Sequence, residues 1–164
     1  MRVLGIDPGT VTMGYGIIDS EGDKVTLVKY GALQVKERSP IGERLSFLYN
    51  GLMEIMARYK PDAVAIEQPF VAVNAKSALA IGRAQAIAIL AAANNKIPGY
   101  EYTPAQIKQQ VANYGASSKE QIQEMVKLHL RLDEIPQPND AADALAVALC
   151  HVQEMHLKNL LSER

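Results

Sequence analysis

Cysteine is almost absent from this sequence of 164 residues, and long hydrophobic runs are missing as well. The single cysteine, Cys150, excludes a disulfide within the chain, and its Ala/Leu-rich surroundings favour a small core residue over a reactive thiol. The longest nearly uncharged run, residues 84–93, is well short of the ~18–20 residues that span a bilayer. Asp7 interrupts the apolar start, so no signal peptide is expected. We therefore expect a cytoplasmic protein without membrane contact.

An excess of basic charge is also missing, because the formal net charge is -1. A basic domain is the usual sign of nucleic-acid binding, and the total gives no such sign. The charge is unevenly distributed, however: residues 72–131 carry +4 and the rest of the chain carries -5. This distribution allows a locally positive face opposite an acidic centre.

Hydrophobic periodicity and turn residues divide the chain into five strands and five helices. The predicted strands are residues 3–7, 13–19, 25–35, 63–66 and 100–102. The predicted helices run from 41 to Pro61, over 75–94, from Pro104 after an N-cap at Thr103, after a capping box at 117–120, and from about 138 to 161. The first three strands suggest an antiparallel meander. This order predicts an α/β fold with a five-stranded mixed sheet flanked by helices, in one domain over residues 1–164.

Two carboxylates follow buried strands. Asp7 ends the first strand and Glu67 follows Ala63-Val64-Ala65-Ile66, so both should emerge at the rim of the sheet. If the two strands are neighbours, the acids lie about 5 Å apart in backbone position. Two carboxylates at such a short distance repel each other unless a cation lies between them. Either acid alone is equally well interpreted as a solvated loop residue.

Two further carboxylates begin the last helix. Asp140 and Asp143 are three residues apart and therefore share one face, where the helix dipole favours their ionised forms. Asp143 is surrounded by alanine, leucine and valine, a pattern typical of core packing, so it should face a buried cation. Asp140 alone is also explained as an ordinary first-turn acid.

These ligand candidates are all hard oxygens, which suit Mg²⁺ or Mn²⁺. Zinc is not expected, because the three histidines lack metal-ligand spacing and are interpreted as structural: His129, His151 and His156. Carboxylate-bound Mg²⁺ commonly acts on phosphates. The loop at residues 7–10, with Gly14 and Gly16 nearby, lacks the lysine and serine of a Walker A motif, so we favour a hairpin turn over a phosphate-binding loop.

Three motifs together resemble one family. Gly5-Ile6-Asp7-Pro8-Gly9-Thr10, Ile66-Glu67 followed by Phe70, and Asp140-Ala141-Ala142-Asp143-Ala144-Leu145-Ala146 are similar to the RuvC family of bacterial Holliday-junction resolvases. The similarity extends over nearly the whole chain, including residues 77–82 and 104–111.

The resemblance implies a ribonuclease-H-like fold and a homodimer that acts on four-way DNA junctions. It assigns catalysis to Asp7, Glu67, Asp140 and Asp143, stacking near the junction centre to Phe70, and DNA contacts near the scissile phosphate to Lys108 and Lys119. We add Lys76 and Arg83 of the basic stretch as candidate DNA contacts. Without the resemblance, Phe70 would be interpreted as a core residue and the lysines as solvated.

One departure from the family lies before Lys119, where Asn113 replaces a family-typical glycine. Asn tolerates a left-handed backbone, so the turn can be kept. The replacement puts in doubt the preferred cleavage sequence and the strength with which this segment binds DNA, more than the hydrolysis reaction. A junction-migrating helicase complex of RuvA and RuvB is a partner implied by the family alone.

The function we expect is DNA hydrolysis by two Mg²⁺ ions held by the four acids, one activating water and one stabilising the leaving oxygen. The products would carry a 5′-phosphate and a 3′-hydroxyl, and Lys119 or Lys108 would add positive charge near the transition state. Two symmetric cuts would resolve a junction in recombination and repair. Two alternatives are an actin-like ATP-using enzyme, for which the chain is too short, and an inactive junction-binding scaffold, in which an acid should have been lost.

Overall fold

Five strands form a single mixed sheet in the computed structural model, which describes residues 1–68 and 74–162. The strands are β1 (Arg2–Asp7), β2 (Thr12–Glu21), β3 (Lys24–Gln34), β4 (Ala63–Glu67) and β5 (Gly99–Tyr102). Their spatial order is β3-β2-β1-β4-β5. The first three strands pair antiparallel, whereas β1, β4 and β5 run parallel. The predicted meander and the mixed sheet are confirmed.

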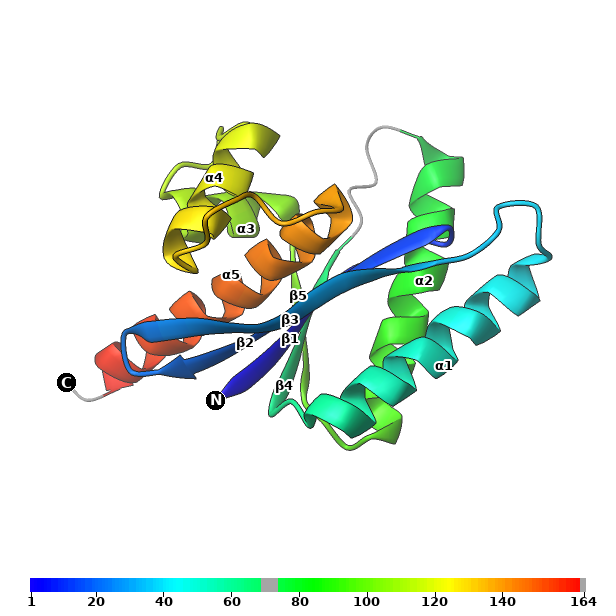
Figure 1. Ribbon diagram of the computed structural model, residues 1–164, viewed down its shortest axis with the longest axis horizontal. Helices are drawn as coiled ribbons and strands as arrows, with labels where there is room; N and C mark the ends of the chain where they lie inside the picture. The colour runs from blue at the N-terminus through cyan, green and yellow to red at the C-terminus, as the bar shows by residue number, and fades with distance from the viewer. Residues whose placement is uncertain (69–73, 163–164) are drawn as a thin grey trace.

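The helices cover both faces of this sheet (Figure 1). Helices α1 (Ile41–Tyr59) and α2 (Ala75–Asn94) lie on one face. Helices α3 (Pro104–Ala112), α4 (Lys119–His129) and α5 (Asn139–Ser162) lie on the other. The chain therefore has three layers, with α5 lying along β1 and β2 as the central helix of its layer (Figure 1).

Side chains at the helix starts explain where most helices begin. Asn74 accepts a hydrogen bond from the Lys76 backbone N–H, and Thr103 forms a capping box with Gln106. The capping box of α4 joins Ser118 and Gln121, one residue later than the 117–120 box predicted from the sequence. Helix α1 differs, because Pro40 occupies its N-cap position and supplies no side-chain hydrogen bond.

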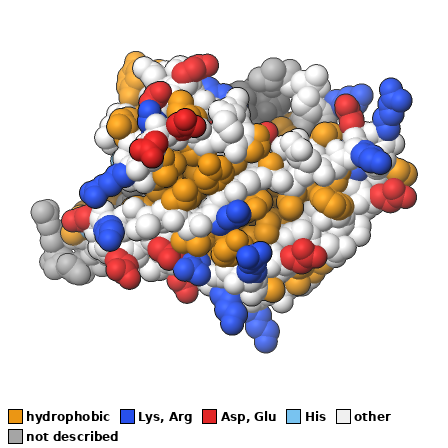
Figure 2. Space-filling model, viewed as in Figure 1, with side chains coloured by type: hydrophobic (Ala, Val, Ile, Leu, Met, Phe, Trp, Pro, Cys, Tyr) orange, Lys and Arg blue, Asp and Glu red, His pale blue; other side chains and the backbone are white. Residues whose placement is uncertain are grey.

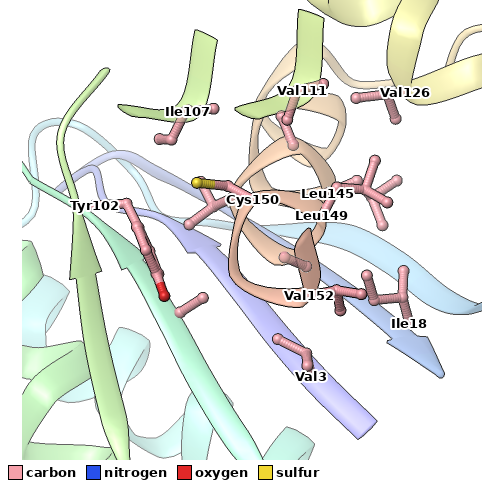
Figure 3. Packing of buried hydrophobic residues seen from close by; sticks show 14 of the residues in the cluster. Val3, Ile18, Tyr102, Ile107, Val111, Val126, Leu145, Leu149, Cys150 and Val152 are labelled. Atoms are coloured by element: carbon pink, nitrogen blue, oxygen red, sulfur yellow. The ribbon is translucent and has the colours of Figure 1, made fainter. Parts of the chain in front are cut away.

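Alternation along the strands divides the interior into two cores. Val3 and Ala65 belong to the core under α5, whereas Leu4 and Ile66 belong to the core under α1 and α2. Figure 3 shows the first of these cores, with residues of α3, α4 and α5 converging on the sheet. Cys150 lies in it and is fully buried, which confirms its interpretation as a core residue.

Helix α5 lies unusually close to the sheet because glycines face it. A Cβ at Gly5 would collide with the Ala144 carbonyl oxygen, and one at Gly14 would collide with that of Asp140. Both glycines lie within strands, so their role is close packing of a helix rather than phosphate binding. This contact fixes the first turn of α5 against β1 and β2.

Helix α2 is more apolar than its neighbours. By length and composition it could cross a membrane, with a mean hydropathy of 1.3 over its most apolar window. Its buried face is made of four alanines that pack on the sheet beside α1, which is typical of a core helix in a layered fold: Ala84, Ala88, Ala91 and Ala92. Its outer face, by contrast, exposes Leu79, Ile89 and Leu90.

Candidate active site

Asp7 and Glu67 are neighbours at the rim of the sheet. Ile6 of β1 pairs in parallel register with Ile66 of β4, so the two acids that follow occupy matching positions at the strand ends. Each continues the alternation of residues that face α5, since Val3 and Ala65 precede them on that face. The two carboxylates therefore point to the same side of the sheet, toward α5.

Asp140 and Asp143 arrive at the same place from the first turn of α5. Asp7 pairs with Gly14, whose missing side chain lets the Asp140 backbone lie directly against β2. Asp143 is one turn further and four-fifths of its side chain is buried. The four carboxylates of the predicted ligand set thus come together from β1, β4 and α5.

The electrostatics of this cluster are unfavourable for four free carboxylates. Burial raises the pKa of Asp7 to about 9, and repulsion from Glu67 and Asp143 adds to the effect. Burial likewise raises the pKa of Glu67, partly opposed by its hydrogen bond to Asp7. Asp7 and Glu67 are close enough to share one proton. Without a cation, the site reduces its negative charge by keeping this proton.

Lys119 supplies the one positive charge in direct contact with these acids among the described residues. Its Nζ lies 2.9 Å from Oδ2 of Asp143, and the hydrogen bond raises the pKa of Lys119. Burial raises the pKa of Asp143, whereas Lys119 opposes that shift. Lys119 is the first residue of α4, so the Ser118 cap determines its position.

A cavity of about 290 Å³ opens beside Glu67 and Asp143. Lys108 and Lys119 line it together, so the two predicted phosphate-contacting lysines lie at one place although eleven residues separate them. The other described residues in its wall are apolar: Pro104, Ile107, Ile122 and Ala146. Sequence reasoning missed this wall, because apolar residues at helical spacing are interpreted as core.

The other predicted DNA contacts are placed differently. Lys76 and Arg83 lie on α2, on the opposite layer from α5, and neither lines the cavity. Both are exposed. Phe70 falls outside the described residues. Asn113 has a φ of 57°, the left-handed conformation expected where it replaces a glycine.

The histidines are structural in their contacts, as predicted. Nδ1 of the buried His151 lies 2.7 Å from the Tyr102 hydroxyl, and burial lowers the His151 pKa to about 4. His129 contacts the Val111 carbonyl oxygen at 3.1 Å. His156 lies 3.5 Å from an Asp23 carboxylate oxygen at the surface.

The cluster suits a hard divalent cation in ligand chemistry, since the metal ligands that the described residues bring there are carboxylate oxygens. Among the residues the structure describes, however, no three Asp, Glu, His or Cys side chains are already arranged to hold one ion. The contacts explain why: Asp143 is turned to Lys119, and Asp7 and Glu67 are paired with each other. The acids fit a cation in kind and position, and their side chains would have to turn to bind it.

Comparison with known proteins gives a consistent result. Residues 3–151 match the protein family described as "Crossover junction endodeoxyribonuclease RuvC". A protein of that name from Dehalococcoides mccartyi is 57% identical over 163 residues, covering 99% of this chain and 98% of the relative. One from Chloroflexus aggregans is 51% identical over 151 residues, covering 92% of each chain.

Solved structures agree with the sequence match. The structure titled "T. thermophilus RuvC in complex with Holliday junction substrate" superposes with a TM-score of 0.91 at 34% identity, covering 96% of both chains. The yeast mitochondrial Holliday junction resolvase Ydc2 shares the fold, with a TM-score of 0.64 at 16% identity over 98% of this chain and 85% of that one.

Proposed function

The chain belongs to the RuvC family of crossover junction endodeoxyribonucleases, with its ribonuclease-H-like fold, and we propose that it cuts four-way DNA junctions at Asp7, Glu67, Asp140 and Asp143. The enzyme class follows from family membership over nearly the whole chain. The assignment of the cutting site rests on one observation above all. Four acids from three separate elements converge beside Lys119, and the pKa values of Asp7, Glu67 and Asp143 are raised there.

We propose that the four acids hold two Mg²⁺ ions, for which Mn²⁺ can substitute. Bound there, the ions would supply Lewis-acid activation and charge neutralisation for phosphodiester hydrolysis. The repulsion among Asp7, Glu67 and Asp143 supports this proposal, because a cation relieves it. Hydrolysis would leave a 5′-phosphate and a 3′-hydroxyl.

The lysines complete the proposed site. Lys119 and Lys108 line the cavity beside the acids, and each can donate to a non-bridging phosphate oxygen of the bound strand. The apolar wall of Ile107 and Ile122 excludes water from one side of the cavity, which strengthens these contacts. Phe70, three residues after the end of β4 and outside the described residues, is proposed to stack near the junction centre.

A second copy of the chain is proposed as the partner that makes paired, symmetric cuts possible. The outer face of α2 supports this idea, because Leu79, Ile89 and Leu90 are 57%, 42% and 49% exposed on an otherwise Ala-rich helix. Sedimentation of the purified chain would show the dimer directly. We further propose a single-domain cytoplasmic protein that works with a junction-migrating RuvA–RuvB complex, which co-purification would test.

Cutting of a synthetic four-way junction tests the proposed function. With Mg²⁺, the protein should nick the junction, and Asp7→Asn should still bind it while nicking about a thousandfold more slowly, since a metal site supplies several kcal/mol to the transition state. Linear duplex of the same sequence is the control. Equal cutting of the junction and the linear duplex would contradict the proposed preference for junctions. An Asp7→Asn protein that nicks as fast as the parent would contradict the assignment of the acids to catalysis.

A further inference from the structure

A second cavity lies between the end of β3 and the first turns of α1. It measures about 340 Å³ and is lined by side chains of both elements and of the turn between them: Gln34, Val35, Lys36, Ser39, Glu43, Arg44 and Phe47. Four of these side chains carry hydrogen-bond donors: Gln34, Lys36, Ser39 and Arg44. None of the lining residues belongs to the acidic cluster or its lysines.

Arg44 in this cavity has an unusual environment. Its Nε is shielded from solvent and makes no hydrogen bond within the described part of the chain. A shielded guanidinium N–H without an acceptor is unfavourable, so it indicates a missing acceptor. Lys36 and Arg44 also form no ion pair with any described residue. The cavity therefore combines one unused donor, the Arg44 Nε–H, with two positive charges that form no ion pair with a described residue.

The backbone adds to this donor set. Pro40 provides no side-chain cap for α1, so the first N–H groups of this 19-residue helix lack a side-chain partner. Glu43 is the one acid in the lining, and it leaves the lining with a net positive charge. Figure 2 shows Lys and Arg side chains, with Asp or Glu side chains beside them, at the right-hand end of the view, where the β3–α1 connection of Figure 1 lies.

The cavity lies at the same rim of the sheet as the acids, but beside α1, whereas the acids face α5 on the other side of the sheet. Val35 N–H donates to the Val11 carbonyl oxygen at 2.9 Å, which fastens the segment after β3 to the loop that follows Asp7. β3 is two strands from β1, or about 10 Å across the sheet. Successive nucleotides of a duplex rise about 3.4 Å along its axis. A DNA arm whose phosphate lies at the acids would have to pass around the β3 edge of the sheet to bring a later phosphate to this cavity.

We propose that this cavity binds a backbone phosphate of a junction arm, with Arg44 and Lys36 as its ligands and Phe47 beside the adjoining sugar. The proposal rests on the proposed function, since it assumes that DNA lies at the acids. The site contributes to the affinity for a junction arm and takes no part in phosphodiester hydrolysis. Phosphate is favoured over a carboxylate ligand because the family acts on DNA, whose backbone carries one phosphate per nucleotide, and because the donors are charged.

The test measures junction binding in the Asp7→Asn background, so that no DNA is cut. Arg44→Gln and Lys36→Gln should each weaken binding roughly five- to tenfold, as one lost charge-assisted hydrogen bond does. Each should also reduce the slope of log K against log salt by about 0.9 per phosphate contact. Arg58→Gln, at the other end of α1, is the matched control and should change neither quantity. Glu43→Gln should tighten binding, because it removes the opposing charge.

A second measurement locates the phosphate. Methylphosphonate groups, which are uncharged, replace single phosphates along one arm. At one position along the arm, the methylphosphonate should weaken binding by the Asp7→Asn protein. The same methylphosphonate should not weaken binding further when the protein also carries Arg44→Gln. The proposal would be overturned if every methylphosphonate weakened binding equally in the proteins with and without Arg44→Gln. It would also be overturned if Arg44→Gln and Lys36→Gln changed junction binding no more than Arg58→Gln does. If the Asp7→Asn protein does not prefer the junction over linear duplex, the proposed function fails instead.

Discussion

The two ends of strand β1 differ in whether their charged side chains have partners of opposite charge. At its beginning, the Arg2 guanidinium makes two hydrogen bonds of 2.8 Å to the Asp19 carboxylate and one of 2.9 Å to the Tyr59 carbonyl oxygen. At its end, Asp7 meets Glu67 and Asp143, and its pKa rises to about 9. The first end is a satisfied structural contact. The second is an arrangement that stability alone would not select, which supports the proposal that this is the functional end.

The largest expected effect comes from separating the acids at the functional end. Gly14→Ala would place a methyl group where the Asp140 carbonyl oxygen lies and push the first turn of α5 off β2. We expect a loss of about 3 kcal/mol in the free energy of unfolding, typical of a backbone collision in a packed core, together with loss of junction nicking. Urea unfolding and the nicking assay measure the two effects.

Gly42→Ala is the control for that substitution, because a Cβ at Gly42 meets nothing within 4 Å. It lies in α1, where alanine is a better helix former than glycine, so unfolding should be unchanged or slightly harder. A Gly14→Ala protein as stable and active as Gly42→Ala would show that the close approach of α5 does not hold the acids together.

A second, smaller effect is the pH dependence of the metal-free protein. Asp7 has a raised pKa, so its contribution to stability is complete below the unfolded value of 3.8 and is lost as the pH rises toward about 9. Between pH 7 and 9 the free energy of unfolding should therefore fall, by at most about 1.4 kcal/mol per pH unit for one proton. Asp7→Asn should flatten this decline, and so should Mg²⁺.

His151 provides an internal contrast in the acid range. Its pKa is lowered from 6.5 to about 4 by burial, so the folded protein favours the neutral ring and stability falls as the pH drops from 6.5 toward 4. This group is neutral in both states above pH 7.5 and does not disturb the alkaline measurement. A free energy of unfolding that is constant from pH 7 to 9 would contradict the strained state of the acids.

The smallest effect is expected at the structural end. Asp19→Asn removes the charge that pairs with Arg2, and each side chain is more than one-third exposed, at 36% and 39%. Water screens such a pair, so the loss should be about 0.5–1 kcal/mol, seen as a decrease of a few degrees in Tm. Junction nicking should not change. A large loss of nicking in this variant would mean that the two ends of β1 are coupled.

The sequence predicted the elements well because their signals are local. Periodicity, Pro61 and the caps at Thr103 and Ser118 each act over a few residues, and the structure follows them to within one or two positions. Asp7 and Glu67 could also be proposed as neighbours, because both end buried strands. The parallel pairing of β1 and β4 that makes them neighbours depends on strand order, which no local pattern encodes.

Other parts of the site depend on distant packing. Gly14 was visible in the sequence, but its contact with Asp140 joins residues more than a hundred positions apart. The ion pair of Lys119 with Asp143, and the cavity that Lys108 shares with them, require α3 and α4 to be docked on α5. The unused donor of Arg44 likewise appears only when side chains are placed.

Helix α5 has a consequence for how the protein opens. Its first turn carries Asp140 and Asp143, and eleven of its residues are buried between the sheet and α3 and α4. Local fluctuations that expose this turn must disturb the core itself, so its two acids are released only when the whole domain unfolds. Hydrogen exchange should follow global unfolding for the amides in the buried middle of α5. We expect the shorter helix α4, with three buried residues, to open more readily, so that the backbone carrying Lys119 moves more easily than the backbone carrying Asp140 and Asp143.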